Sequence, residues 1–131
     1  MLIKKDIETR TDIEKFLLLF YKSVLHDPTI GIIFTTIFPL NIEKHIPVIT
    51  DFWETILLDH HVYKKNAMQV HYDINKEYPL QKMHFDAWLH LFNTTLDELF
   101  AGEKTLLAKK RALGIAQLMQ LKMNEINLCN E

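Results

Sequence analysis

One histidine, His71, lies in a short segment between two long apolar stretches of the sequence. Three further side chains with a polar group on an aromatic ring, Tyr21, His45 and Trp88, fall on the apolar stripes of three different expected helices. A histidine on one side of a helix-lined cavity can ligate a metal, and hydrogen-bond donors on the other side can stabilise a polar ligand. The four residues together predict a metal or cofactor site in a helical core.

Each of the three opposing residues also has a simpler explanation. A buried tyrosine hydroxyl such as that of Tyr21 often bonds to a backbone carbonyl, because leaving it unsatisfied costs about 1–3 kcal/mol. His45 is in the first turns of its expected helix, where a histidine is often a rim or capping residue. Trp88 could be an ordinary core tryptophan. Only the convergence of these residues opposite His71 favours a shared site.

The elements that must position these residues are expected to be helices, which makes the fold all-α. Apolar residues recur at helical spacing, and only 3 glycines and 4 prolines interrupt the chain. A capping box at residues 11–14 (Thr-Asp-Ile-Glu) predicts the start of a first long helix that ends near His26. A short helical piece is expected at residues 30–34, followed by a turn at 35–40.

The second half of the chain continues this pattern. Asn41 is the expected N-cap of a helix that ends near Leu58, and residues 59–78 are expected to be irregular apart from the short helix that carries His71. Pro79 should begin a helix that ends near Gly102, and residues 103–127 should form the last helix. On the helix of Trp88, the residues His84 and His90 are expected to be exposed.

Composition limits the classes of protein that fit. A chain of 131 residues with 48% hydrophobic residues is expected to form a single domain spanning residues 1–131. A net charge of -2 argues against nucleic acid and anionic membranes as partners. No apolar run reaches the roughly 18 residues of a membrane span, and no signal-peptide core is present. Cys129 is the single cysteine, which suits a reducing compartment, so we expect a cytoplasmic protein.

The chain resembles the group III truncated haemoglobins, which are short bacterial globins with a trimmed helical sandwich around a haem. The specific part of the resemblance is the spacing from Phe52 and Trp53 to His71 and on to Trp88. The other matching motifs are Phe20-Tyr21, residues 30–34 (Ile-Gly-Ile-Ile-Phe), His45, Tyr63, residues 68–71 (Met-Gln-Val-His) and residues 85–92. Residues 64–67 (Lys-Lys-Asn-Ala) depart from the glycine and proline that the family commonly has there.

This resemblance implies a truncated globin fold and a haem b cofactor (iron protoporphyrin IX). It places the proximal iron ligand on His71 and the distal, ligand-binding residues on Tyr21, His45 and Trp88. Oxygen, nitric oxide and carbon monoxide are the implied gas ligands, with a reductase as a possible partner. The family's proposed roles are sensing, nitric oxide detoxification (a nitric oxide dioxygenase activity) and peroxide (peroxidase-like) chemistry, and the residues do not choose between them. The side chains expected to contact the cofactor are Phe34, Phe38, Phe52, Trp53, Tyr63, Met68, His71 and Phe92.

Three alternatives remain open from the sequence. The adjacent pair His60 and His61 is the rival for the proximal ligand. A cofactor-free helical interaction domain would use the aromatic stripes only for packing. A non-haem helical metal protein is less favoured, because the Glu-x-x-His pattern of di-iron bundles is absent.

Overall fold

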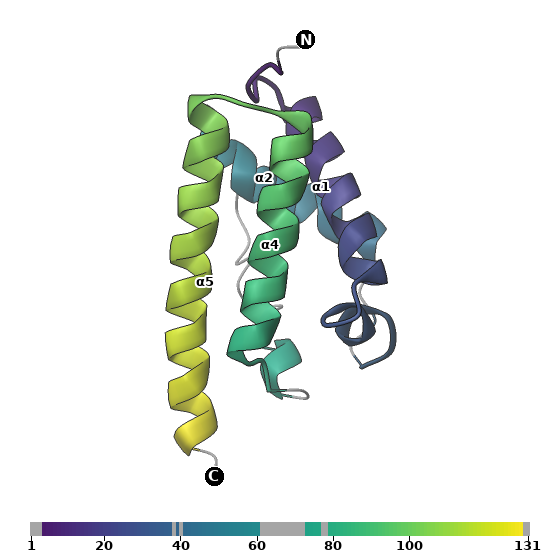
Figure 1. The fold of residues 1–131 in the computed structure, drawn as a ribbon, viewed down its shortest axis with the longest axis vertical. Helices are drawn as coiled ribbons and strands as arrows, with labels where there is room; N and C mark the ends of the chain where they lie inside the picture. The colour runs from purple at the N-terminus through teal and green to yellow at the C-terminus, as the bar shows by residue number, and fades with distance from the viewer. Residues whose placement is uncertain (1–3, 38, 40, 61–72, 77–78, 130–131) are drawn as a thin grey trace.

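The fold is built from helices, as the sequence predicts. The computed structural model describes residues 4–37, 39, 41–60, 73–76 and 79–129, with side chains up to residue 125. No strand occurs in those ranges, which confirms the all-α prediction. Residues 73–76 form a single helical turn. The main elements in chain order are α1 (Arg10–His26), the π-helix η1 (Ile33–Ile37), α2 (Ile42–Leu58), α4 (Lys82–Leu99) and α5 (Glu103–Cys129) (Figure 1).

Helix α1 begins earlier than predicted. Its N-cap is Thr9, whose hydroxyl accepts a hydrogen bond from the Asp12 backbone N–H at 3.2 Å. The Asp12 carboxylate in turn accepts from the Thr9 N–H at 3.1 Å, which completes a capping box. The prediction of a box at residues 11–14 is therefore wrong by two residues, because Asp12 closes the box with Thr9.

The turn predicted at residues 35–40 is partly wrong, since η1 continues to Ile37. The chain folds back against the end of α1 just before η1. A Cβ atom on Gly31 would lie only 2.8 Å from the carbonyl oxygen of Leu25, so glycine permits this close approach. Short π-helical segments are often found at functional sites.

The remaining boundaries follow the predictions more closely. Helix α2 has Asn41 as its N-cap and ends at Leu58, as expected. Helix α4 begins at Lys82 rather than at Pro79, because Gln81 caps it. Helix α5 extends two residues beyond the predicted end.

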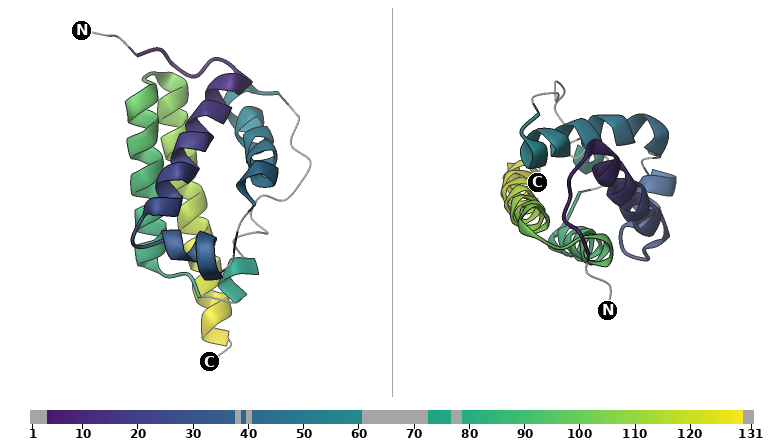
Figure 2. Two further views of the ribbon diagram at one scale, coloured as in Figure 1. Left: turned by 90° about the vertical axis from the view of Figure 1, so that its right-hand side faces the viewer. Right: turned by 90° about the horizontal axis from the view of Figure 1, so that it is seen from above.

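The helices pack around one continuous set of buried side chains. Helices α4 and α5 lie side by side and run in opposite directions, while α1 packs against α4 and α2 (Figures 1 and 2). The inner stripe predicted for α1 is buried, and it consists of Phe16, Phe20, Tyr21 and Val24. No helix in the described ranges is both long enough and apolar enough to cross a membrane.

The carboxylate of Asp6 caps the start of α5. Asp6 accepts hydrogen bonds from the backbone N–H groups of Lys104 at 2.8 Å and Thr105 at 3.0 Å, and from the Thr105 hydroxyl at 2.8 Å. Gly102 precedes them with φ 143°, and a Cβ atom there would lie 2.5 Å from the Asp6 side chain. Asp6 therefore caps a helix that begins almost a hundred residues later.

Candidate functional site

Two of the predicted distal residues are hydrogen-bonded to each other inside the molecule. Tyr21 on α1 and His45 on α2 are both buried, and 2.8 Å separates the Tyr21 hydroxyl from His45 Nε2. Their rings meet edge to face with centroids 5.3 Å apart. This contact rules out the simpler reading in which the Tyr21 hydroxyl bonds only to the backbone.

The electrostatics of this pair favour neutral side chains. Burial lowers the pKa of His45 and raises the pKa of Tyr21. When His45 carries its proton on Nε2, it donates to the tyrosine oxygen, and the Tyr21 O–H can then donate to a third group. When the proton is on Nδ1, Tyr21 donates to His45 instead. The pair can thus offer a single neutral donor to a ligand beside it.

Trp88 is joined to this pair through one aromatic side chain. Phe20 packs edge to face against Trp88, with ring centroids 5.6 Å apart, and also contacts Tyr21 at 5.2 Å. The predicted cofactor contact Phe92 stacks on Trp88 at 5.1 Å and lies 5.2 Å from Trp53. One aromatic cluster from α1, α2 and α4 therefore surrounds the predicted distal residues.

Two other predicted contacts lie at the edges of this cluster. Phe52 is half-buried and meets Trp53 edge to face at 5.3 Å. Phe34, within η1, is half-buried and lines a cavity that Trp88 also lines. The predicted site residues Phe38, Tyr63, Met68 and His71 lie outside the described residues, as does the rival His61. The other rival, His60, is exposed.

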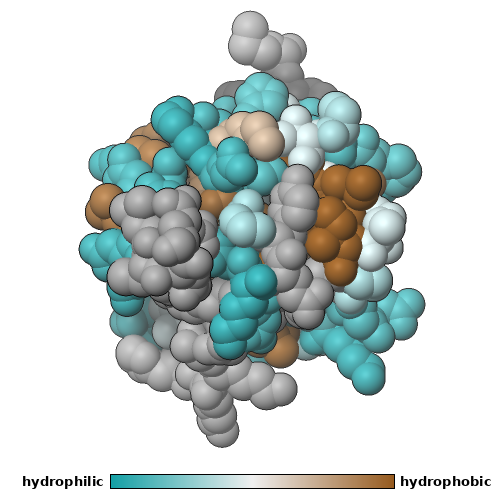
Figure 3. Space-filling model, turned by 90° about the horizontal axis from the view of Figure 1, so that it is seen from below, coloured by the Kyte–Doolittle hydropathy of each residue, from teal (hydrophilic) through white to brown (hydrophobic). Residues whose placement is uncertain are grey.

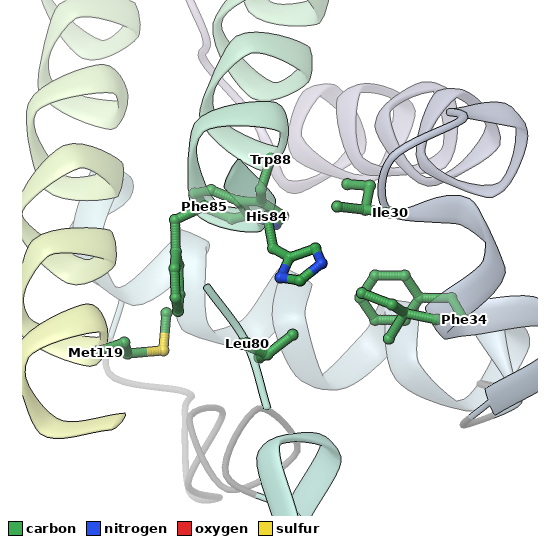
Figure 4. Close-up of a pocket in the computed structure, with 8 residues that line it drawn as sticks. Ile30, Phe34, Leu80, His84, Phe85, Trp88 and Met119 are labelled. Atoms are coloured by element: carbon green, nitrogen blue, oxygen red, sulfur yellow. The ribbon is translucent and has the colours of Figure 1, made fainter. Parts of the chain in front are cut away.

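The cavity beside Trp88 is small and apolar. Figure 4 shows its lining, with His84 between Trp88, Phe34 and Leu80. Its volume is about 30 Å³. Such a space holds about two water molecules, whereas a site for a small organic ligand usually measures roughly 300–1,000 Å³. The full lining consists of Ile30, Ile33, Phe34, Leu80, His84, Phe85, Trp88 and Met119.

His84 was predicted to be exposed, and this prediction is wrong, because its side chain is only 4% accessible. Its Nδ1 accepts a hydrogen bond from the backbone N–H of Gln81 at 2.8 Å, which turns the ring over the start of α4. The neutral ring then carries its proton on Nε2. The sequence held a usable signal, since His84 is one helical turn before Trp88 and so shares its face.

The two buried histidines predict a pH dependence of stability. Burial lowers the pKa of both His45 and His84 from the ordinary value of 6.5. The unfolded chain therefore binds more protons than the folded chain as the pH falls below 6.5. We expect both histidines to contribute their full stabilisation above pH 6.5. The free energy of unfolding should decrease below pH 6.5, and urea unfolding across this range measures the decrease.

A variant separates the contribution of one histidine from general acid effects. His84→Gln keeps an acceptor for the Gln81 N–H but does not titrate, so its stability should fall less steeply between pH 6.5 and pH 5. The carboxylates with lowered pKa, Asp6 and Asp12, titrate below this window because their ordinary value is 3.8. An unchanged slope in His84→Gln would show that His84 does not contribute.

The described residues fit one part of a haem site. They offer flat aromatic walls and neutral buried donors, which suit an apolar macrocycle with a small polar ligand above it. The 30 Å³ cavity would have to widen to admit such a group. No cluster of three or more histidine, cysteine or acidic side chains with metal-binding geometry occurs in the part of the chain that the structure describes.

This end of the molecule also presents apolar surface. Figure 3 views the molecule from below and shows a hydrophobic area among hydrophilic side chains. Ile32, which directly precedes η1, is 52% exposed. Its neighbour Ile33, the first residue of η1, is buried. Apolar side chains of this segment therefore lie both in the core and on the surface.

The helical arrangement matches a truncated globin fold. A solved structure, the group III truncated haemoglobin from Campylobacter jejuni, aligns with 92% of this chain and 95% of its own chain. The TM-score is 0.77 and the sequence identity is 27%. No protein-family model matches the sequence, and no curated protein matches it. The resemblance to group III truncated haemoglobins that the sequence predicts is therefore confirmed.

Proposed function

We propose that this chain, as a single domain over residues 1–131, binds haem and holds a diatomic gas ligand beside Tyr21 and His45. The observation that carries the proposal is the buried hydrogen bond between these two side chains, linked through Phe20 to Trp88, in a truncated globin fold. The pair can offer a neutral donor to a ligand, and the indole of Trp88 is one aromatic contact away from it. The rival reading as a cofactor-free interaction domain gives them no role.

We propose that His71 would hold the haem iron. The described chain just after it supports the assignment. Ile74 is fully buried, and the Asn75 side chain accepts a hydrogen bond from the Leu80 N–H at 2.9 Å, so this stretch is fixed against the start of α4. Leu80 also lines the cavity beside Trp88, so residues 74 and 75 lie close to that cavity. The proposed cofactor contacts are Phe34, Phe38, Phe52, Trp53, Tyr63, Met68 and Phe92.

We propose the non-covalent haem b as the form of haem. Covalent attachment of a c-type haem uses two cysteines in a Cys-x-x-Cys-His motif. This chain has one cysteine, Cys129, and no such motif. Binding would then come from His71 and the apolar contacts.

When bound, the haem would supply an iron centre that takes a diatomic gas such as oxygen, nitric oxide or carbon monoxide. The protein's own part is to donate a hydrogen bond from Tyr21, to set the direction of that bond through His45 and to exclude water with the Phe20, Trp88 and Phe92 rings. Such donors slow the release of a polar ligand, which favours sensing, nitric oxide detoxification or peroxide chemistry over oxygen delivery. Repeated redox turnover would require electrons from a reductase.

Titration of the purified, haem-free chain with haemin tests this proposal. We expect one equivalent to bind, an intense Soret band to appear and the unfolding midpoint in urea to rise, because a ligand that binds the folded state stabilises it. Bovine serum albumin and free haemin provide the spectral controls. A colourless, stably folded chain whose unfolding midpoint ignores haemin would favour the interaction domain instead.

A further inference from the structure

His84 is a buried polar side chain that the proposed gas site does not use. It lies in the first turn of α4 and forms part of the wall of the cavity beside Trp88. Its ring projects between Phe85 and Phe34 (Figure 4). Among the described residues that line the cavity, only His84 and Trp88 carry a nitrogen on the side chain, and the others are aliphatic, aromatic or thioether groups. A ligand that enters this cavity therefore meets one imidazole in an apolar wall.

The hydrogen bond to Gln81 determines what that imidazole offers to a ligand. The backbone N–H of Gln81 donates to His84 Nδ1 at 2.8 Å, so Nδ1 is an acceptor and the neutral ring carries its proton on Nε2. Burial lowers the pKa of His84, which keeps the ring neutral at pH 7. Because Gln81 is the N-cap of α4, the same bond ties the ring to the end of the helix. The Nε2–H side of the ring is thus a neutral donor with a fixed direction.

Haem, the proposed ligand, has two parts with different requirements. Its macrocycle is flat and apolar, which suits the aromatic walls of the cavity, but it also carries two carboxylates. An ionised carboxylate is costly to bury unless hydrogen-bond donors or solvent satisfy it. The cavity lies where α4 begins, at the lower end of that helix in Figure 1. A carboxylate placed there needs a donor from the wall, and His84 is positioned to provide one.

We propose that His84 donates a hydrogen bond from Nε2 to one carboxylate of the haem, a role that rests on the proposed binding of haem. A hydrogen bond to a charged acceptor is stronger than one between neutral groups. The positive end of the α4 helix dipole stabilises the same negative charge. Lys82, the first residue of α4, is 75% exposed and is paired with Asp86 at 2.7 Å. His84 is therefore a positioning residue that fixes one edge of the haem at the start of α4.

A comparison of haemin with its dimethyl ester, in which both carboxylates are uncharged, tests this role. Each compound is titrated into the wild-type chain and into His84→Phe, which keeps an aromatic ring but has no donor, and the Soret band reports the affinity. We expect His84→Phe to weaken the binding of haemin about tenfold more than the binding of the ester, because only haemin loses a bond to a charged acceptor. A purely structural effect, such as the lost bond to Gln81, weakens both compounds by the same factor.

A second variant keeps the test decisive if His84→Phe does not fold. In His84→Asn the side-chain oxygen takes the place of Nδ1 and can accept from the Gln81 N–H, but no donor reaches the place of Nε2. It should show the same selective loss of haemin affinity. His90→Phe is the matched control, since His90 is exposed on the same helix, and it should keep the wild-type ratio of the two affinities. Circular dichroism checks that each variant is folded.

The outcomes distinguish the role of His84 from haem binding itself. If a folded His84 variant binds haemin and keeps the wild-type ratio of the two affinities, His84 does not contact a carboxylate, and the proposed binding of haem still stands. The same conclusion follows if His90→Phe lowers the ratio as much as His84→Phe does. A wild-type chain that binds neither haemin nor the ester would overturn the proposed function and the role of His84 together.

Discussion

Replacing Tyr21 with phenylalanine is expected to speed oxygen dissociation from the haem-loaded protein by about tenfold to a hundredfold. The hydroxyl is buried beside His45 and is the strongest donor that the described residues offer to a ligand. A hydrogen bond to a charged or strongly polarised acceptor contributes about 1.5–3 kcal/mol, and each 1.4 kcal/mol changes an equilibrium or rate by about a factor of ten. Stopped-flow displacement of oxygen by carbon monoxide measures the dissociation rate.

A variant elsewhere on the surface controls for a general effect of losing a hydroxyl group. Thr94 is exposed on α4, and Thr94→Val removes its hydroxyl without touching the aromatic cluster. Its oxygen dissociation rate should equal that of the wild-type protein. The assignment of Tyr21 to the ligand side fails if Tyr21→Phe and Thr94→Val release oxygen at the same rate.

Replacing Asp6 with alanine is expected to lower the free energy of unfolding by about 2–3 kcal/mol, which combines the loss of a helix cap with the loss of a partner for a buried threonine hydroxyl. The carboxylate accepts from two backbone N–H groups at the start of α5 and from the Thr105 hydroxyl, and Thr105 is buried. Burial opposes the charge, but these hydrogen bonds outweigh it and lower the pKa of Asp6. Urea unfolding of the variant measures the loss.

Two further variants make this test specific. Asp86 is exposed and paired with Lys82 at 2.7 Å, so Asp86→Ala should change stability by less than about 0.5 kcal/mol. Asp6→Asn keeps one acceptor oxygen and should fall between the wild-type chain and Asp6→Ala. If Asp6→Ala is no more harmful than Asp86→Ala, then Asp6 does not fasten α5.

Local signals in the sequence were sufficient to predict α2. The cap residue Asn41 and the apolar spacing after it define α2 over its whole length, and the structure agrees. The start of α1 could not be decided in the same way, because Thr9 and Thr11 each precede an acidic residue at the spacing of a capping box. The choice follows from the chain before the helix, where the Glu8 N–H also donates to Asp12 at 2.9 Å.

The candidate site was predicted as a set of residues but not as a geometry. Tyr21 and His45 were both expected on inner faces, yet their direct hydrogen bond depends on how α1 and α2 cross, which no local pattern encodes. The burial of His84 depends on a hydrogen bond back to Gln81 that forms only when α4 begins at Lys82. Because α4 was predicted to begin at Pro79, the hydrogen bond between His84 and Gln81 was not expected. The assignment of His71 stays a prediction from the sequence.

The proposed ligation of the haem iron by His71 can be tested with the Soret spectra of two histidine variants. His71→Ala and His60→Ala are each titrated with haemin, and circular dichroism confirms that both are folded. His60 is exposed at the end of α2 and serves as the control. We expect His60→Ala to give the wild-type Soret band and His71→Ala to lose it or shift it strongly. A wild-type band in His71→Ala, or its loss in His60→Ala alone, would show that His71 does not ligate the iron.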